Sequence, residues 1–443
     1  MFHRSTVMLF VCVGALVFRF THLPDAEGVR RDFFDGRETV AIKNVAAKIV
    51  SDPDRGQSDQ RLYIELVDTA TPHTKTKIRV TTGLLDHFAM GDLVELSCMV
   101  RQPEPFNGFA YDKYLLRYGA IGVCSNAQLR AIGHTDSTQS RIVQTKHMVL
   151  KKVRAALPAP ENGLIAGIVF GEMRAIPDQH LEYFQRSGTS HLLVISGSNI
   201  ALIAQWVRLL LARYCHYRAT IALTMIAIAH YVIMTGIQSS ALRAAVFGSI
   251  VLLAEFLRRP SDGVRALLYV ATLMALINPL MPLYDPGFQL SFLASLGMLL
   301  WGTPLQKLKL MQAVPETAGL REALSTTLAA TIITTPFIAY QFQTFSPVSV
   351  FANIILVPLM SSYLLIGIIV SGICVISPTI GFFICLPLYF LFRLTYDLVE
   401  LFGSLSFASI PVTTLSLNLV LATYVIVAAF AWKKMFYYKR IAV

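Results

Sequence analysis

Residues 219–236, ATIALTMIAIAHYVIMTG, and residues 323–339, ALSTTLAATIITTPFIA, contain no Asp, Glu, Lys or Arg. An apolar stretch of about 20 residues has the length that crosses the hydrocarbon core of a bilayer as a helix. Similar apolar runs nearly touch one another from residue 190 onward. The sequence therefore predicts a polytopic α-helical membrane protein.

The composition supports the same class. Of the 443 residues, 54% are hydrophobic and 15% are charged, whereas an ordinary soluble domain has about 25% charged residues. This deficit excludes a soluble enzyme, a disordered chain and a coiled coil. The net charge is +11, yet residues 22–140 carry 14 Lys and Arg against 16 Asp and Glu. The positive excess thus lies in the membrane portion, where it sets orientation and can attract a polyanion or anionic lipid.

Residues 25–130 are predicted to form a separate polar domain. Short strands separated by Pro, Gly and Asp are expected at 39–50, 61–68, 77–81 and 93–101. Several short strands in about 100 residues favour a small β-barrel of the OB type. Cys98 and Cys124 either form a disulfide, if this domain faces an oxidising compartment, or remain free thiols in a small core.

Two segments flank this domain. Residues 1–24 hold a short apolar run after His3 and Arg4, which favours an uncleaved membrane anchor over a cleaved signal peptide. Residues 131–189 begin with a basic amphipathic stretch that favours a helix lying on a membrane surface. The alternative is a linker helix on the solvated face of the polar domain. The basic residues of this stretch are Arg141, Lys146, Lys151, Lys152 and Arg154.

Residues 190–443 are expected to form the main transmembrane domain. With the anchor, its nine apolar runs make ten spans; they lie at 190–212, 219–236, 240–257, 265–283, 287–303, 323–342, 347–375, 380–403 and 412–431. Alternate connections are rich in Lys and Arg, whereas those at 236–240, 283–287, 343–347 and 404–411 have none. By the positive-inside rule both termini are cytoplasmic and the β domain is outside the inner membrane. The basic helix at 141–154 conflicts with this rule.

Three polar clusters interrupt the apolar runs. Polar groups within spans are costly and usually face a cavity or one another. The clusters are SGTSHLLVISGSN at 187–199, TGIQSSALR at 235–243 and YDPGFQLSF at 284–292. In the first, His191, Ser198 and Gln205 share a face if the helix is continuous. The alternatives are helix packing for the first cluster, an Arg243 that extends to the interface, and an Asp285 that caps a helix.

Known catalytic and metal-binding patterns are absent from the sequence. No HExxH, Walker or GxSxG pattern occurs, and no two histidines are spaced as HxH or HxxxH. We therefore expect no catalytic residue, no metal and no cofactor, and a protein that is not an enzyme. Arg393, Asp397 and Glu400 share one helix face, which favours an Arg–carboxylate pair.

Four stretches resemble the ComEC family of bacterial competence proteins. They are PEPFNGFAYDKYLLRYGAIG at 103–122, SGTSHLLVISGSNIALIA at 187–204, TGIQSSALRAAV at 235–246 and INPLMPLYDPGFQLSFLASLGML at 277–299. The resemblance covers about residues 33–305, and residues 305–443 match only in hydropathy. In one departure, the family's Ser-Gly-Leu-His is replaced by Ser-Gly-Ser-Asn at 196–199, so no proton role of that histidine carries over.

The resemblance implies an inner-membrane channel that conducts single-stranded DNA to the cytoplasm. The shared polar positions around the path would be His191, Ser196, Gly197, Arg243, Asp285, Gln289 and Ser291. An external DNA-binding competence protein and a cytoplasmic ATPase are implied as partners, besides the DNA and membrane lipid. Because the sequence ends at Val443 without a metallo-β-lactamase-like domain, we expect a short member and a separate nuclease.

The edge of the polar domain suits single-stranded DNA, which binds to basic grooves with stackable rings. Phe106, Phe109, Tyr111 and Arg117 offer such a surface; the alternative is that they pack the domain onto the membrane portion. Three other functions stay open: a secondary transporter for a small anionic solute, a membrane-embedded hydrolase, and a scaffold. The transporter is the strongest alternative, although no inverted repeat was found in the sequence.

Overall fold

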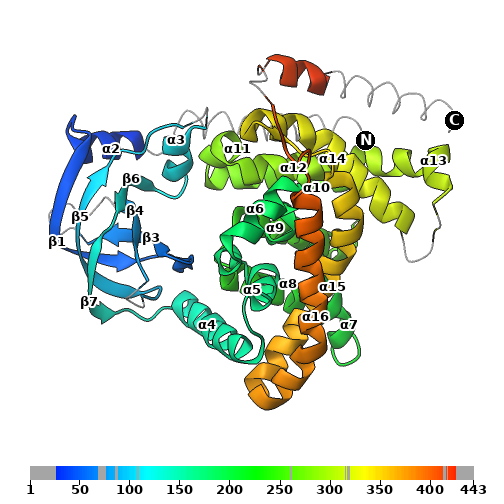
Figure 1. Cartoon of the computed structure of the whole chain (residues 1–443), viewed down its shortest axis with the longest axis horizontal. Coiled ribbons are helices and arrows are strands. Elements are labelled where there is room, and N and C mark those ends of the chain that lie inside the picture. The colour runs from blue at the N-terminus through cyan, green and yellow to red at the C-terminus, as the bar shows by residue number, and fades with distance from the viewer. Residues whose placement is uncertain are drawn as a thin grey trace.

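A computed structural model shows a β-barrel beside a helical body (Figure 1). It describes residues 26–67, 76–84, 88–106, 109–259, 262–314, 316, 320–412, 416 and 418–425. The predicted anchor at 1–24 and half of the predicted span at 412–431 lie outside these residues.

Seven strands form the sheet of the polar domain. They are β1 Thr39–Ile49, β2 Asp54–Arg55, β3 Asp59–Leu66, β4 Lys77–Gly83, β5 Asp92–Arg101, β6 Ala120–Ser125 and β7 Gln128–His134. The order β1-β3-β4-β6-β5 closes because β1 also pairs with β5. The β4–β6 pair is parallel and the other pairs are antiparallel. This closed five-stranded barrel confirms the predicted small β-barrel domain.

Alternating residues fill the barrel. Leu62 and Ile64 of β3 and Ile78 and Val80 of β4 are fully buried, as expected for strands with period-2 patterning. Phe34, at the end of α2 (Ala26–Phe34), joins the same core. The core thus follows from the alternation visible in the sequence.

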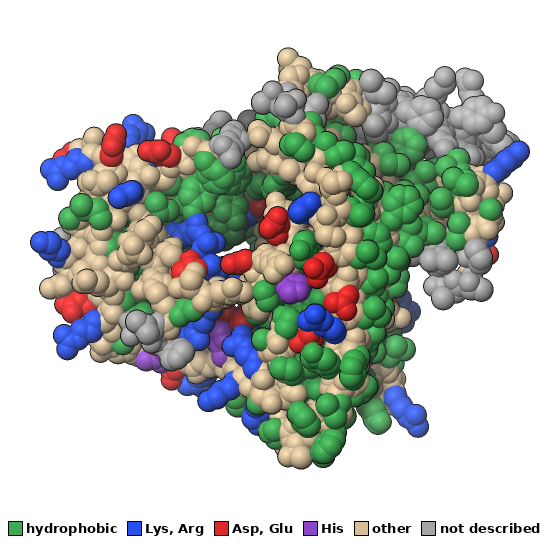
Figure 2. All heavy atoms as spheres, viewed as in Figure 1, with side chains coloured by type: hydrophobic (Ala, Val, Ile, Leu, Met, Phe, Trp, Pro, Cys, Tyr) green, Lys and Arg blue, Asp and Glu red, His purple; other side chains and the backbone are tan. Residues whose placement is uncertain are grey.

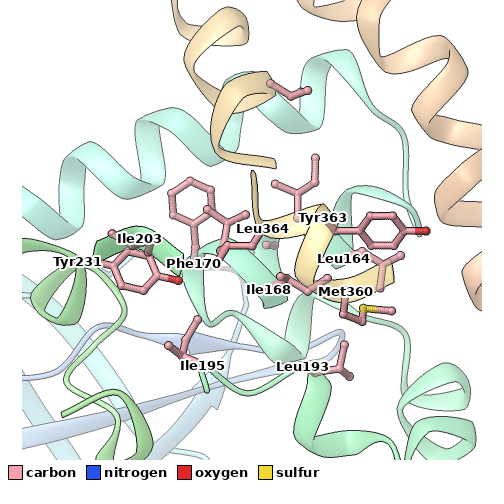
Figure 3. Packing of buried hydrophobic residues seen from close by; sticks show 14 of the residues in the cluster. Leu164, Ile168, Phe170, Leu193, Ile195, Ile203, Tyr231, Met360, Tyr363 and Leu364 are labelled. Carbon is pink, nitrogen blue, oxygen red and sulfur yellow. The ribbon is translucent and has the colours of Figure 1, made fainter. Parts of the chain in front are cut away.

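Three helices connect the barrel to the membrane portion. They are α4 Thr138–Ala156, α5 Asn162–Phe170 and α6 Asp178–Arg186, with the short η1 Met173–Ala175 before α6. All nine residues of α5 are buried. Leu164 and Ile168 of α5 pack in one cluster with Met360 and Leu364 of a later helix (Figure 3). Helix α5 is therefore the centre of the main hydrophobic core.

The helical body continues with α7 Gly197–Leu211, α8 Tyr217–Met234, α9 Ser239–Phe256, α10 Gly263–Ile277, α11 Leu280–Tyr284, α12 Pro286–Gln306, α13 Lys309–Gln312 and α14 Leu320–Phe342. Helices α7 and α9 run parallel. A Cβ at Gly197 would lie 3.8 Å from Ala244, and Arg208 pairs with Glu255 at 2.6 Å. The connections after α7 and α9, which carry arginines, therefore lie at the same end.

Six helices among the described residues are long and apolar enough to cross a membrane: Ser190–Leu211, Tyr217–Met234, Ser239–Phe256, Pro286–Gln306, Ser349–Ile376 and Pro378–Gly403. Helix α10 is apolar but has only 15 residues. These helices confirm a multi-pass membrane protein.

The last two of these helices, α15 (Ser349–Ile376) and α16 (Pro378–Gly403), form a hairpin that runs crosswise to α12 and α14 in Figure 1. Lys152 of α4 donates to the carbonyl of Val375 at the hairpin tip, at 2.7 Å. Lys146, six residues earlier on α4, pairs with Asp52 of the barrel. Six residues advance a helix by about 9 Å, far less than the roughly 30 Å of a hydrocarbon core.

These contacts place the hairpin tip near the level of the barrel contact, whereas the ten-span topology places the turn at 376–379 on the opposite side of the membrane from the barrel. Arg186 of α6 donates to the carbonyl of Leu405 at the open end of the hairpin, at 3.2 Å. The hairpin thus lies against α4 and α6 along its length. Its apolar residues serve in part to pack against the protein, which hydropathy cannot distinguish from insertion in lipid.

Candidate functional site

Six aromatic rings form a continuous cluster on the barrel, which we call the aromatic face: Tyr63 of β3, and Phe106, Phe109, Tyr111, Tyr114 and Tyr118 between β5 and β6. Neighbouring ring centroids lie 5.0 to 6.4 Å apart, within the range of aromatic pairs. Phe106 and Tyr118 are 55% and 40% exposed. The cluster thus keeps ring surface open to solvent.

The short helix α3 (Tyr111–Leu116) orients these rings. Leu115 and Leu116 are buried, and Tyr111, Tyr114 and Tyr118 follow at spacings of three and four residues. Residues at these spacings share one helix face. Because the two leucines face the interior, the three tyrosines lie together on the opposite side of α3.

Two arginines complete the aromatic face. Arg79 of β4 donates to the Tyr111 hydroxyl and lies 5.7 Å from the centre of that ring. Arg117 lies 4.7 Å and 4.1 Å from the ring centres of Tyr114 and Tyr118. Such cation–π contacts hold the guanidinium groups flat against the rings.

Two tyrosine hydroxyls of this face, those of Tyr63 and Tyr114, stay protonated. Burial, and then the neighbouring Tyr118, raises the pKa of Tyr63 to about 12, although Arg79 and Arg117 act in the opposite direction. Burial likewise raises the pKa of Tyr114. These two rings therefore add no negative charge at neutral pH, which suits an anionic ligand.

The aromatic face ends at a buried contact with the helical body. The guanidinium of Arg117 forms an ion pair with Asp285, and the two side chains are 2% and 4% exposed. Asn278 donates to the carbonyl of Arg117 at 2.7 Å. Arg117 thus docks the barrel, as the packing alternative held, and it is not open to an external ligand.

A second contact joins the two parts through Arg174 of η1. Its guanidinium pairs with Asp59 and donates to the carbonyl of Asp54 at 3.1 Å. A Cβ at Gly56 would overlap this guanidinium, so the glycine gives the arginine room. Tyr63 lies four residues after Asp59 on β3, about 13 Å along the strand. The aromatic face therefore lies between the two contacts.

A third contact surrounds Asp52, which precedes β2. Its carboxylate pairs with the buried Lys146 and lies 2.6 Å from His147 Nε2. Glu172 lies 3.1 Å from Lys146 Nζ and 3.1 Å from Arg154. Asp52, His147 and Glu172 have the spacing of metal ligands, but the Lys146 ammonium between the two carboxylates already supplies the positive charge.

Figure 2 shows a hollow between the barrel and the helical body, with hydrophobic side chains above it and basic and acidic side chains around it. The three contacts described above bridge the two parts around this space. A hollow with charged rims and exposed rings can admit a hydrated, flexible and anionic chain.

Two of the predicted path residues are engaged elsewhere. Asp285 caps α12 by accepting from the Gly287 amide at 2.9 Å and also pairs with Arg117. Gln289 donates to the carbonyls of Pro282 and Leu283, both at 2.9 Å. These two side chains thus hold the α11–α12 corner together.

Three other predicted path residues line one cavity of about 730 Å³: Gly197 of α7, Arg243 of α9 and Ser291 of α12. Arg243 is only 4% exposed and contacts the carbonyls of Gly287 and Ser240 at 3.4 and 3.3 Å. The structure therefore brings these three residues together, as the sequence clusters suggested.

The first polar cluster does not form a continuous helix. His191 lies in a short 3-10 turn, Ser190–Leu192, and α7 begins only at Gly197. The helix face expected for His191, Ser198 and Gln205 is therefore wrong for His191, which is exposed outside α7. Ser196 caps α7 by accepting from the Asn199 amide at 3.4 Å; its residue type at a helix start signals this cap.

Other predicted features have clear positions. Cys98 of β5 and Cys124 of β6 are joined in a disulfide with Cα atoms 6.3 Å apart. The basic helix α4 packs Val143, Lys146, Leu150 and Val153 inside the protein, while Arg141 stays exposed. Arg393 pairs with Asp397 at 3.3 Å, and Glu400 is exposed.

Sequence reasoning did not single out Tyr63 or Arg79. Tyr63 and Arg79 lie on β3 and β4 directly opposite each other in register, and only strand pairing brings them to the 106–118 segment. The signal available in the sequence was a Tyr and an Arg at outward-facing positions of two predicted strands.

Comparison with known proteins identifies the membrane portion. A family model described as "Competence protein" matches residues 168–436, so the likeness extends beyond residue 305, where the sequence resemblance had weakened to hydropathy. The chain is 25% identical over 276 residues to ComE operon protein 3 of Bacillus subtilis (strain 168), which is 62% of this chain. It is 26% identical to the uncharacterized protein YcaI of Escherichia coli (strain K12) over 41% of this chain.

The matched parts span 34% and 28% of those two relatives, about a third of their length. No solved structure matches the chain.

Proposed function

The chain belongs to the ComEC family of competence proteins, and we propose from this membership and from the aromatic face that it takes part in DNA uptake. In this proposal it admits single-stranded DNA through the inner membrane to the cytoplasm. The observation that carries the proposal is the aromatic face with Arg79 beside it, bordering the hollow between the barrel and the helical body.

Single-strand binding needs stacking surfaces and positive charge in the same groove. Phe106 and Tyr118 are the exposed rings of the aromatic face, and Arg79 is stacked beside Tyr111. Because the hydroxyls of Tyr63 and Tyr114 stay neutral, these rings do not oppose a phosphate that contacts Arg79. This chemistry favours a nucleic-acid strand as the ligand over a small anionic solute, because a small solute has no series of bases to stack on the rings.

The charge distribution supports a barrel on the outer side. Arg213, Arg218, Arg258 and Arg259 follow α7 and α9 at one end of these parallel helices. The barrel contacts Asp285 at the start of α12, close to Arg243 near the start of α9. Basic connections favour the cytoplasm, so the barrel lies opposite. Removing the α15–α16 hairpin from the count of spans keeps that count even, so both termini remain cytoplasmic.

The chain would act with partners. An external DNA-binding competence protein would deliver the strand, and a cytoplasmic ATPase would draw it inward. We propose that the chain itself breaks no covalent bond, and that a separate nuclease removes the other strand.

The test measures binding of a fluorescent oligothymidine to the full chain in lipid nanodiscs. Stacking is worth about 1–3 kcal/mol per base, so Phe106→Ala and Tyr118→Ala should each weaken binding roughly 5- to 150-fold. Arg79→Gln should weaken binding and lower the salt dependence by about 0.7 in log–log slope, as for one lost phosphate contact on a single strand. The same variants should lower transformation.

The matched control is Ile132→Ala, which removes a 55% exposed side chain on β7 outside the aromatic face. It should leave binding unchanged. Oligothymidine binding that is equal in wild type, Phe106→Ala and Tyr118→Ala would remove the aromatic face from the path.

A further inference from the structure

The cavity between α7, α9 and α12 contains a buried cation that lacks an acidic partner. Arg243 is 4% exposed, and among the described residues no carboxylate forms an ion pair with it. Its two carbonyl contacts, at 3.4 and 3.3 Å, are longer than usual hydrogen bonds. A buried charge is costly unless a charged partner compensates it. This end of the cavity is therefore suited to an anion.

Two hydroxyl groups lie near the same end. The buried Ser240 hydroxyl, three residues before Arg243, has no hydrogen-bond partner among the described residues, and Ser291 of α12 lines the cavity. Arginine with hydroxyl donors is a combination that binds phosphate oxygens. The anion that fits best is thus a phosphate group.

The rest of the cavity is apolar. Ala201 and Ala204 of α7 and Gly248 and Leu252 of α9 line it, and the small size of the two alanines and the glycine makes room between the helices. Arg243 and Leu252 are separated by about 13 Å along α9. The volume of about 730 Å³ falls within the usual range of sites for organic ligands. An apolar chain is the natural occupant of this part.

The opposite end of the cavity does not require a charged group from a ligand. Arg208 pairs with Glu255 through two contacts of 2.9 and 2.6 Å, so its charge is already compensated. The cavity therefore offers one uncompensated positive charge and one apolar trough. A polynucleotide carries a negative charge on every nucleotide, whereas this cavity offers one uncompensated cation.

We propose that this cavity binds an anionic phospholipid, with its phosphate at Arg243 and an acyl chain between α7 and α9. The bound lipid would compensate the Arg243 charge and complete the packing of the helical body. This site is separate from the aromatic face, so it stands whether or not that face binds DNA.

The test adds phosphatidylglycerol to the delipidated full chain and counts retained lipid by native mass spectrometry. One molecule should stay bound to the wild type. Arg243→Gln should weaken retention roughly tenfold or more, as expected for one lost charge-assisted contact. Gly248→Leu should also abolish retention, because a Cβ at Gly248 has open space around it and a larger side chain fills the trough.

The matched controls are Gly372→Leu on α15, where a Cβ also meets nothing within 4 Å, and Arg213→Gln at the exposed end of α7. Both should retain lipid as the wild type does. Inorganic phosphate alone should not displace the lipid, because it lacks the chain.

Equal retention in wild type, Arg243→Gln and Gly248→Leu would overturn the proposal. So would displacement of the lipid by oligothymidine with cross-links to α7 or α9, because the cavity would then be part of the DNA path. Oligothymidine binding at the aromatic face is read separately, so failure of the lipid site and failure of the proposed function are distinguishable.

Discussion

The hollow beside the barrel and the cavity around Arg243 differ in whether their positively charged side chains have acidic partners. Around the hollow, Arg117, Lys146 and Arg174 are all paired with carboxylates, and ring surface is left open. In the cavity, Arg243 has no acidic partner among the described residues, and most of the wall is apolar.

This difference indicates which ligand each region fits. Paired arginines hold a scaffold in shape, so the open rings and Arg79 remain to bind a hydrated strand. An unpaired arginine in an apolar wall instead needs a ligand that brings both a charge and a hydrocarbon chain. Polar side chains between membrane helices are therefore not by themselves evidence of a wet conduit.

The largest expected effect concerns which side of the membrane the α15–α16 hairpin lies on. Ile376, at the hairpin tip, is 86% exposed. In intact cells Ile376→Cys should react fully with a membrane-impermeant maleimide added from outside, because the tip lies within about 9 Å of the level of the barrel contact. The readout is the labelled fraction by gel shift.

Two matched positions calibrate this labelling. Met99→Cys on the barrel, 54% exposed, should label from outside. Tyr214→Cys, 82% exposed after α7, should label only in permeabilised cells. If Ile376→Cys behaves like Tyr214→Cys, the hairpin crosses the membrane.

The next effect tests whether paired charges hold the hollow open. Arg117→Ala leaves Asp285 buried without its partner, which typically costs about 3–5 kcal/mol. The barrel should then detach from the helical body, and protease should cut between α3 and β6 faster than in wild type. Oligothymidine binding should fall with it.

A control separates this contact from ordinary surface charge. Arg265→Ala removes the half-exposed pair with Asp262 and should cost less than about 1 kcal/mol. Equal protease sensitivity of Arg117→Ala and wild type would show that the barrel is held by other contacts.

The fold was predictable from the sequence where a residue pattern is compatible with one structure alone. Short strands separated by Pro, Gly and Asp predicted the barrel, and the length of the apolar runs predicted the helices of the membrane portion. The hairpin position was not predictable, since α15 and α16 have the same hydropathy whether they face lipid or α5. Its place follows from contacts such as Lys152 with Val375, between residues far apart in sequence.

The candidate site was predictable in part. The 103–122 stretch contained five of the six rings of the aromatic face, and the clusters gave Gly197, Arg243 and Ser291 of the cavity. Whether a charge is paired depends on tertiary contacts, so Arg117 and Arg243 looked alike in the sequence. Tyr63 and Arg79 join the aromatic face only through strand register.

The smallest effect concerns pH and the contact around Asp52. Burial raises the pKa of Asp52, but its hydrogen bond with His147 and the charge of Lys146 outweigh this, so the pKa lies below its usual value. Burial lowers the pKa of Lys146, but Asp52 and Glu172 raise it above its usual value. The Asp52 contribution is therefore present above its unfolded pKa, about 3.9, and is lost as pH falls through the folded pKa. The Lys146 contribution is present below about 10.4 and is lost as pH rises through its raised value.

With respect to this pair, stability should thus be flat between about pH 5 and 9, fall in acid, and fall again in alkali above about pH 10.4. Asp52→Asn should lower the free energy of unfolding at pH 7 by about 1–3 kcal/mol, the cost of a lost charge-assisted hydrogen bond at a buried site, and should flatten the fall in acid. Thermal unfolding of the full chain in nanodiscs from pH 3 to 7 measures both. We expect this acid dependence because the ion pairs around the hollow contain carboxylates. Retention of phosphatidylglycerol at Arg243 should not change in the same pH range. A common pH profile for both regions would contradict the separation between them.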